Sequence, residues 1–112
     1  MSEEIIARTK YVRISPRKAR LAARLIARMP AETALLQLKT LPMKGARLLK
    51  KTLDSAVANA QENFSLKVSS LRIQEVRVDE GPTMKRAKSK NRGGRVPIMK
   101  RTSHFTIVLR AE

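Results

Sequence analysis

The chain has 112 residues, of which 25 are Lys or Arg and nine are Asp or Glu, so its formal net charge at pH 7 is +16. This length is that of one domain, and an aromatic content of 3% requires a core built from aliphatic side chains. So large an excess of positive charge indicates a polyanionic partner. A nucleic-acid backbone is the simplest such partner, and an anionic membrane surface is the other candidate.

Several classes of site are excluded by what the sequence lacks. There is no cysteine, so disulfides and thiolate metal sites are impossible, and this absence is compatible with a reducing cytoplasm. The longest run without a charged residue is 102–109, far shorter than the roughly 20 residues of a membrane-spanning helix. The N-terminus begins acidic and lacks the apolar stretch of a secretory signal. We therefore expect no membrane segment and no export signal.

The first predicted elements are a strand over residues 5–14 and a helix over residues 17–29. The strand mixes β-branched and basic residues. Ser15 and Pro16 then supply an N-cap and a proline at the first helical position. We expect the apolar face of this helix to be core, and it consists of Leu21, Ala22, Leu25, Ile26 and Met29.

A second face of this helix carries only positive charge. Arg17, Arg20, Arg24 and Arg28 recur at spacings of three, four and four, and no acidic residue occurs between Arg8 and Arg28. Like charges one turn apart repel in an isolated helix, and bound phosphates would relieve that repulsion. The alternative is a solvated surface, which usually mixes acidic residues among the basic ones. We favour binding.

Two further helices are predicted, over residues 31–41 and 43–63, because Pro30 and Pro42 bound them. The inward residues of the shorter helix are Ala31, Ala34, Leu35 and Leu38. Those of the longer helix are Ala46, Leu49, Leu53, Ala56, Val57, Ala60 and Phe64. Four basic residues occupy its first half: Lys44, Arg47, Lys50 and Lys51. Positive charge near a helix N-terminus opposes the macrodipole, so a reason other than helix stability is needed for them.

Two strands are predicted later in the chain, over residues 71–79 and 103–110. Apolar residues alternate in both, and the phase slips at Gln74-Glu75, which indicates a bulge or a change of face. The strands are the natural arms of an antiparallel pair, because only a basic segment, residues 81–101, separates them.

This basic segment is predicted to be an extended hairpin or a long loop. Its eight basic residues are accompanied by no acidic one. Its large apolar side chains are Met84, Val96, Ile98 and Met99, too few for a core. Gly81-Pro82 marks a bend, and residues 91–94 (NRGG) offer tight-turn chemistry near the middle. An isolated hairpin of this composition is marginal or disordered in water, so we expect it to order on RNA, which supplies phosphates and bases.

No catalytic, metal or cofactor site is predicted. His104 is the only histidine, and a packed or hydrogen-bonded strand residue is the better interpretation of it. Glu75, Asp79 and Glu80 lie among basic residues, which indicates local charge compensation. Gly93-Gly94 lacks the strand–glycine–helix context of a phosphate-binding loop. An enzyme is therefore disfavoured, because no general acid–base pair is available.

Three separated motifs resemble one known family. They are residues 15–20 (SPRKAR), residues 55–60 (SAVANA), and residues 81–86 (GPTMKR) together with residues 100–104 (KRTSH). Over essentially its whole length the chain is similar to bacterial-type ribosomal protein twenty-two of the large subunit. The resemblance implies an α+β fold, with three helices packed on a small antiparallel sheet and a long β-hairpin projecting from the core. It implies one rRNA-binding domain, with a core of about 1–80 and 102–112 and a hairpin of about 81–101.

The resemblance also implies a function and a set of site residues. It implies a structural, non-enzymatic constituent of the cytoplasmic large subunit that binds 23S rRNA, bridges several rRNA domains during assembly and lines the polypeptide exit tunnel with its hairpin. The expected rRNA-binding residues are Arg13, Arg17, Lys18, Arg20, Arg24, Lys85, Arg86, Lys88, Lys90, Arg92, Arg95, Lys100 and Arg101. The expected tunnel-lining tip is Lys88, Ser89, Lys90, Asn91, Arg92, Gly93, Gly94 and Arg95.

The implied partners are 23S rRNA, other large-subunit proteins and the nascent polypeptide, with no membrane, no small-molecule substrate and no homo-oligomer. A DNA-compacting or architectural protein is the alternative from another class, because a basic β-arm can enter a minor groove. That reading would require dimer symmetry, and the sequence has no obvious dimerisation seam. Affinity for large-subunit rRNA fragments relative to duplex DNA of equal length separates the two hypotheses.

Overall fold

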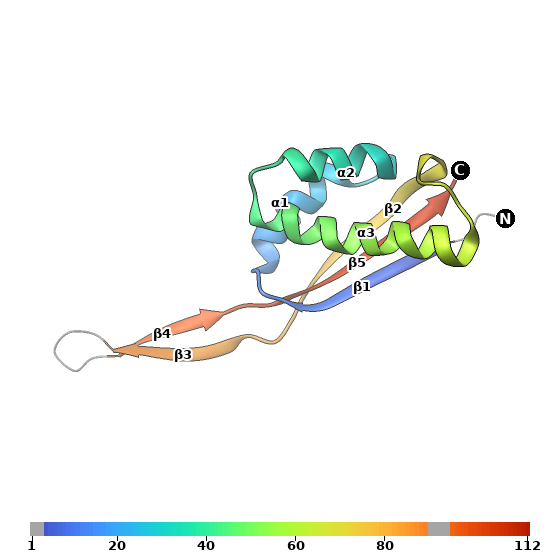
Figure 1. The fold of residues 1–112 in the computed structure, drawn as a ribbon. Coiled ribbons are helices and arrows are strands. Elements are labelled where there is room, and N and C mark those ends of the chain that lie inside the picture. Colours follow the sequence, from blue (N-terminus) through green and yellow to red (C-terminus); the bar gives the residue numbers. More distant parts are fainter. Residues whose placement is uncertain (1–3, 90–94) are drawn as a thin grey trace.

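A computed structural model describes residues 4–89 and 95–112, and of residues 86–89 and 95–98 it describes the backbone alone. The molecule measures 63 × 24 × 18 Å, because a two-stranded hairpin projects from one end of a core of helices and strands (Figure 1). In chain order the elements are β1 (Glu4–Val12), α1 (Pro16–Ile26), α2 (Ala31–Thr40), α3 (Lys44–Phe64), a short 3-10 turn (Val68–Ser70), β2 (Leu71–Glu80), β3 (Met84–Ser89), β4 (Arg95–Lys100) and β5 (Ser103–Ala111). The predicted α+β fold is confirmed.

The core sheet has the strand order β1-β5-β2, and both pairings are antiparallel. The predicted pairing of the two later strands is therefore confirmed, with Val78 opposite Phe105. The register shifts between Ile73 and Glu75, where the phase slip predicted a bulge or a change of face. As the central strand, β5 buries Phe105, Ile107 and Leu109 completely. β5 is therefore central to the core in both its strand pairing and its burial.

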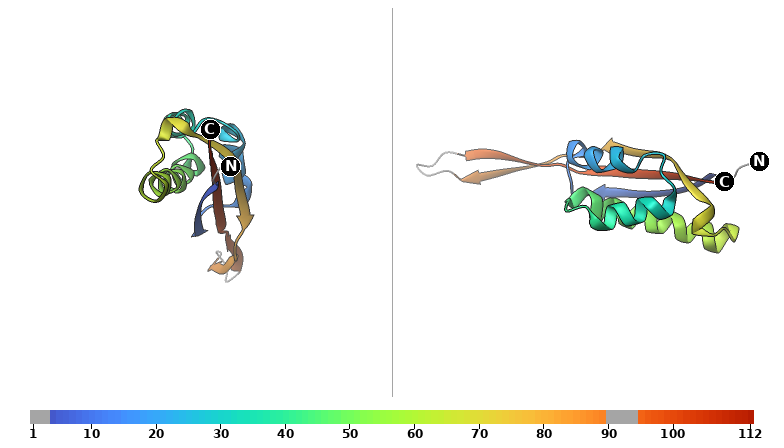
Figure 2. Two further views of the ribbon diagram at one scale, coloured as in Figure 1. Left: turned by 90° about the vertical axis from the view of Figure 1, so that its right-hand side faces the viewer. Right: turned by 90° about the horizontal axis from the view of Figure 1, so that it is seen from above.

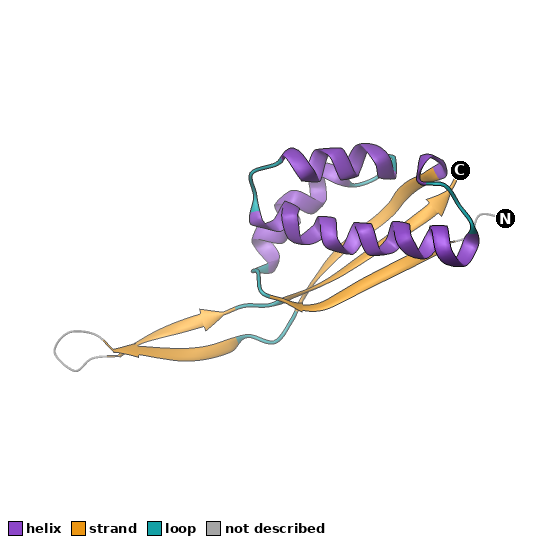
Figure 3. Ribbon diagram, in the orientation of Figure 1, coloured by secondary structure: helices purple, strands orange, loops and turns teal. Residues whose placement is uncertain are grey.

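The three helices pack against the sheet and against one another (Figure 3). α3 contacts β1 and β5, α1 contacts β2, and α2 packs on α3. The end-on view in Figure 2 shows α3 alongside the strands rather than beyond their ends. The core cluster is aliphatic apart from Phe105, as the low aromatic content predicts.

The predicted core face of the first helix is partly wrong. Leu21 and Leu25 are exposed, and the buried side chains of α1 are Pro16, Ala19, Ala22, Ala23 and Ile26. Alanine permits a closer approach between helices than leucine does, and α1 is packed against both α3 and β2. The narrow alanine face therefore lies inward, and the leucines lie outside.

Two helix ends also differ from the prediction. α1 ends at Ile26 rather than Met29, because Arg28 adopts a left-handed φ of 63° and the Met29 carbonyl accepts a hydrogen bond from the backbone N–H of Ile73 at 2.9 Å. Phe64, predicted as core, is the last residue of α3 and is exposed. It lies just before Ser65, whose φ of 53° ends the helix.

The basic segment forms the predicted hairpin. β3 and β4 pair antiparallel from Met84 opposite Lys100 to Ser89 opposite Arg95, as a two-stranded sheet separate from that of the core. We call β3 and β4 the ribbon. The predicted tight turn over residues 91–94 lies outside the described residues.

Candidate nucleic-acid interface

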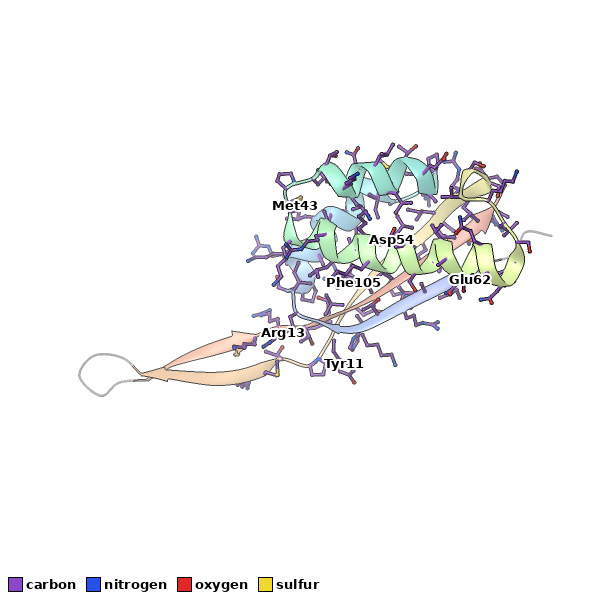
Figure 4. The ribbon with its side chains drawn as sticks, in the orientation of Figure 1. Tyr11, Arg13, Met43, Asp54, Glu62 and Phe105 are labelled. Carbon is purple, nitrogen blue, oxygen red and sulfur yellow. The ribbon has the colours of Figure 1, made fainter. Side chains whose placement is uncertain are left out.

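A groove of about 900 Å³ lies where the ribbon leaves the core. It is formed by the segment before α1, the start of α1, the start of α3 and the end of β4, and Figure 4 labels Arg13 and Met43 in this region. We call it the root groove. Its lining residues are Arg13, Ile14, Ser15, Lys18, Leu21, Met43, Lys44, Gly45, Met99, Lys100 and Arg101. Elements that are more than 50 positions apart in the sequence therefore contribute to one surface.

The root groove is strongly cationic. Five of its lining residues are basic, and none of the described residues that line it is Asp or Glu. The basic residues are Arg13, Lys18, Lys44, Lys100 and Arg101, and all five are exposed. Cations on converging elements, with no carboxylate among them, create the positive potential that attracts a phosphate backbone.

Sequence reasoning identified four of these five cations and left Lys44 out of the predicted site. The signal was present, because Lys44 is the first residue of α3 and opposes the helix macrodipole there. Met43 offers no side-chain cap, and the first turn of α3 contains no acidic residue. A polyanion in the root groove would compensate the positive end of α3 as well as Lys44.

The root groove also presents apolar side chains to solvent. Leu21 is 51% exposed and Met99 is 49% exposed. Ile14, which also lines the groove, is buried, and the start of α3 approaches α1 closely at Gly45. A Cβ added at Gly45 would lie 3.4 Å from the Ala19 Cα and from the Ile14 Cδ1. The root groove thus combines two half-exposed apolar side chains with five cations among its lining residues.

A set of hydrogen bonds fixes the ribbon where it joins the core. The backbone N–H of Gly81 donates to the Thr102 carbonyl at 2.9 Å, and the Thr102 hydroxyl donates to the Pro82 carbonyl at 2.7 Å. The buried Ser103 hydroxyl donates to the Ile14 carbonyl at 2.7 Å. These bonds join the segment that enters the ribbon to the segment that leaves it, and they join the latter to the residues before α1. The ribbon and the root groove therefore have a defined relative position.

The predicted role of His104 as a hydrogen-bonded strand residue is confirmed. Its Nδ1 accepts a hydrogen bond from the backbone N–H of Tyr11 at 3.1 Å, and the two rings meet edge to face with centroids 5.0 Å apart. Tyr11 has a left-handed φ of 58°, where β1 loses its regular register with β5. His104 therefore supports an irregular turn of β1 beside the ribbon's base.

The arginines of the predicted basic face of the first helix do not share one surface in the structure. Arg17 and Arg24 are exposed, but neither lines the root groove. Arg28 lies beside a second cavity of about 470 Å³, which Arg72 and Arg110 also line. Arg20 is bound to the protein itself, because its Nε and Nη2 donate to the Val78 carbonyl at 3.2 and 2.9 Å. Only Lys18, of the basic residues on α1, belongs to the root groove.

For the predicted binding residues that follow Lys85 on β3 and for Arg95 on β4, the structure gives the position of the backbone and its strand register. Arg86, Lys88 and Ser89 follow Lys85 on β3, and Arg95 begins β4. The remaining predicted tip residues lie outside the described residues: Lys90, Asn91, Arg92, Gly93 and Gly94. The described part of the hairpin therefore accounts for the two arms.

The outward surface of the core sheet has mixed charge. Arg8 and Arg77 flank Thr106 of the central strand, Arg77 pairs with Glu75 at 3.6 Å, and Gln74 donates to Glu4 across the sheet at 3.3 Å. The Arg77–Glu75 pair agrees with the predicted local compensation of that carboxylate. This surface is far less suited to phosphates than the root groove.

Two other kinds of site are absent from the described part of the chain. Within residues 4–89 and 95–112, no three acidic or histidine side chains are grouped so that they could hold a metal ion. No helix in these ranges combines the length and the apolar character that crossing a bilayer requires.

Comparison with known proteins gives consistent matches over nearly the whole chain. The family profile described as ribosomal protein L22p/L17e matches residues 7–110. The chain is 63% identical over 101 residues to the large ribosomal subunit protein uL22 of Protochlamydia amoebophila (strain UWE25), with 90% of this chain and 91% of that protein covered. It is 54% identical over 103 residues to the protein of the same name from Chlamydia trachomatis serovar L2b (strain UCH-1/proctitis), covering 92% and 93%.

Proposed function

Because the chain belongs to the ribosomal protein L22p/L17e family, we propose that it is a structural, non-enzymatic, rRNA-binding component of the large ribosomal subunit. The observation that carries the proposal is the joining of a projecting basic ribbon to a cationic groove at its base. Both surfaces are suited to the phosphates of one RNA partner. A net charge of +16 on a chain of this size supports the same partner.

The root groove and the arms of the ribbon are the proposed anchor. Contacts to phosphates fix the position and orientation of a protein on RNA without reading its sequence. We assign that role to Arg13, Lys18, Lys44, Lys100 and Arg101 in the root groove, and to Lys85, Arg86, Lys88 and Arg95 along the arms. Arg17 and Arg24 extend the anchor along α1. Arg20 serves the fold first, because two of its donors are already bound to Val78.

The hairpin is proposed to extend away from the anchored core and to line the polypeptide exit tunnel. In this division the core is about 1–80 and 102–112, and the hairpin is about 81–101. The hydrogen bonds of Gly81 and Thr102 support it, because they mark the place where the ribbon separates from the core sheet. A protein with two RNA-binding surfaces at different distances from its centre can join separate rRNA segments during assembly.

The proposed partners are 23S rRNA, neighbouring large-subunit proteins and the nascent polypeptide at the hairpin tip, and the chain acts as a single copy. The mixed-charge outward surface of the core sheet suits a protein neighbour better than RNA. For the tip, a photo-crosslinking amino acid at Ser89 should form crosslinks to nascent chains in translating ribosomes. The same group at Ile6 on the core sheet should not, and equal crosslinking from both would contradict a tunnel position.

Binding and co-sedimentation test the rRNA assignment. The full chain should prefer 23S rRNA fragments to duplex DNA of equal length and should remain with large subunits through a high-salt wash. Lys44→Gln/Lys100→Gln/Arg101→Gln should reduce retention strongly. The matched control Arg8→Gln/Arg77→Gln/Arg110→Gln removes the same charge from other surfaces and should reduce it little. Equal salt-corrected affinity for RNA and DNA, or equal losses from both triple variants, would overturn the proposal.

A further inference from the structure

The two half-exposed apolar side chains of the root groove are not explained by phosphate binding. Leu21 and Met99 come from α1 and β4, which are remote in the sequence, yet both line the groove, as do five cations. A phosphate backbone offers these side chains nothing, because burial of apolar surface requires an apolar partner. Among the parts of RNA, the face of a base is the surface best suited to apolar contact.

We infer that the root groove holds an unstacked nucleotide from a bulge or single-stranded segment of RNA, with its base against Leu21 and Met99. This inference rests on the proposed function and specifies the form of RNA that the groove takes. The phosphates on either side of the base lie against four basic lining residues, which we call the rim: Lys18, Lys44, Lys100 and Arg101. The cationic rim selects RNA over an apolar peptide, since the described lining contains no carboxylate.

The size of the root groove supports an extruded nucleotide over a continuous duplex. Its volume of about 900 Å³ lies within the roughly 300–1,000 Å³ of pockets that enclose small organic molecules. The bases of an RNA duplex are stacked inside the helix, whereas those of bulges and loops can be splayed out against side chains. A duplex crossing the groove would contact the rim and leave Leu21 and Met99 in water.

The position of Met99 links this site to the hairpin. Met99 pairs with Lys85 in the ribbon, and Lys100 and Arg101 follow it directly into the junction held by Thr102. A nucleotide in the root groove therefore contacts the return arm of the ribbon and α1 at the same time. Its binding would fix the ribbon against the core at the place where the two are joined.

The chain offers a closely matched control for Leu21. Leu25 lies one turn further along α1 and is 44% exposed, but it does not line the root groove. Both leucines can be shortened to alanine with similar effects on helix propensity. A difference in RNA affinity between Leu21→Ala and Leu25→Ala is therefore due to the root groove and not to general surface hydrophobicity.

The test uses the full chain and two RNAs, a 20-base-pair duplex and the same duplex with a central three-nucleotide bulge that contains 2-aminopurine. The bulged RNA should bind at least about tenfold more tightly, and the fluorescence of 2-aminopurine should change on binding. Leu21→Ala and Met99→Ala should each weaken binding of the bulged RNA about fivefold and leave duplex binding unchanged, as expected for loss of partial apolar burial. Leu25→Ala should change neither.

Equal affinity for the two RNAs, or equal effects of Leu21→Ala and Leu25→Ala, would overturn the inference. Displacement of the bulged RNA by polyglutamate of equal charge at similar concentration would also overturn it, because that result would point to an acidic protein. If the protein binds 23S rRNA fragments but shows no preference for the bulge, only the inference fails. If it binds neither the 23S rRNA fragments nor the bulged RNA more tightly than duplex DNA, the proposed function fails as well.

Discussion

Arg20 donates two hydrogen bonds to the backbone carbonyl oxygen of Val78, from Nε at 3.2 Å and from Nη2 at 2.9 Å. The pair connects α1 to β2 across 58 positions, close to the end of the strand that leads into the hairpin. One of the arginines expected to meet phosphates is therefore part of the structure that holds the ribbon's first arm against the core.

Arg20→Ala should lower the free energy of unfolding by about 1–2 kcal/mol, because hydrogen bonds from a charged donor are lost. Arg24→Ala is the matched control, since Arg24 is exposed on the same helix and forms no hydrogen bond or ion pair in the described part of the chain. It should change stability by less than about 0.5 kcal/mol while weakening rRNA binding. Urea unfolding followed by circular dichroism measures both, and equal losses of stability would refute a structural role for Arg20.

Gly81→Ala should destabilise the base of the hairpin. An added Cβ would lie 2.5 Å from the Thr102 Oγ1, which is held by its hydrogen bond to the Pro82 carbonyl. We expect a loss of about 1–3 kcal/mol, the usual cost of overpacking. Thermal unfolding should show this loss and a partial recovery in Gly81→Ala/Thr102→Ala, which removes the clashing oxygen.

Gly45→Ala is the control for the loss of stability that we expect when Gly81 is replaced by alanine. The nearest atoms to an added Cβ there are 3.4 Å away, an ordinary contact, and alanine is favoured over glycine in a helix by up to about 1 kcal/mol. The variant should be as stable as the parent or slightly more stable. A loss as large as that of Gly81→Ala would show that the contact at the hairpin's base is not the cause.

Deletion of residues 83–99 should leave a folded core. The described core cluster extends from Ile5 to Leu109 but includes no residue between Val78 and Phe105, so the deletion removes none of its apolar packing. The shortened chain should keep a cooperative thermal transition within a few degrees of the parent while losing most of its affinity for 23S rRNA. Loss of the cooperative transition would mean that the ribbon is required for folding.

Binding to rRNA should depend steeply on salt. If six to ten phosphates are contacted, affinity should fall by roughly three to five decades between 50 and 200 mM salt. Replacing Lys100 or Arg101 by Gln should reduce the slope of log K against log salt by about 1 each. Arg77→Gln should leave the slope nearly unchanged, because Arg77 lies on the core sheet and pairs with Glu75. An unchanged slope in the Lys100 and Arg101 variants would exclude these side chains as phosphate contacts.

Local patterns in the sequence were sufficient to predict the order and type of the helices and longer strands. Alternating apolar residues predicted the pairing of β2 with β5, and the slip at Gln74-Glu75 predicted an irregularity where the register shifts. The basic segment was recognisable as an extended hairpin or a long loop, because it is too poor in apolar residues for a core and lies between two strands. Such patterns depend on neighbours within a few positions, so they can be read without knowing the fold.

The side of α1 that faces the core was decided by the tertiary structure. Two apolar arcs were available on this helix, one rich in leucine and one rich in alanine, and periodicity could not choose between them. The close approach of α1 to α3 and β2 selected the small side chains, which left Leu21 and Leu25 exposed. That choice depends on the shape of the opposing surface, which the helix's own sequence does not contain.

The sequence by itself determined a small aliphatic α+β domain with an excess of positive charge and a projecting basic hairpin. The tertiary structure alone decided which charges share a surface: it brought Lys44 to Lys18 and Arg101, and it bound Arg20 to Val78. The physical reason is that helical period and charge are local properties. A groove forms only where segments remote in sequence are brought together by a common core.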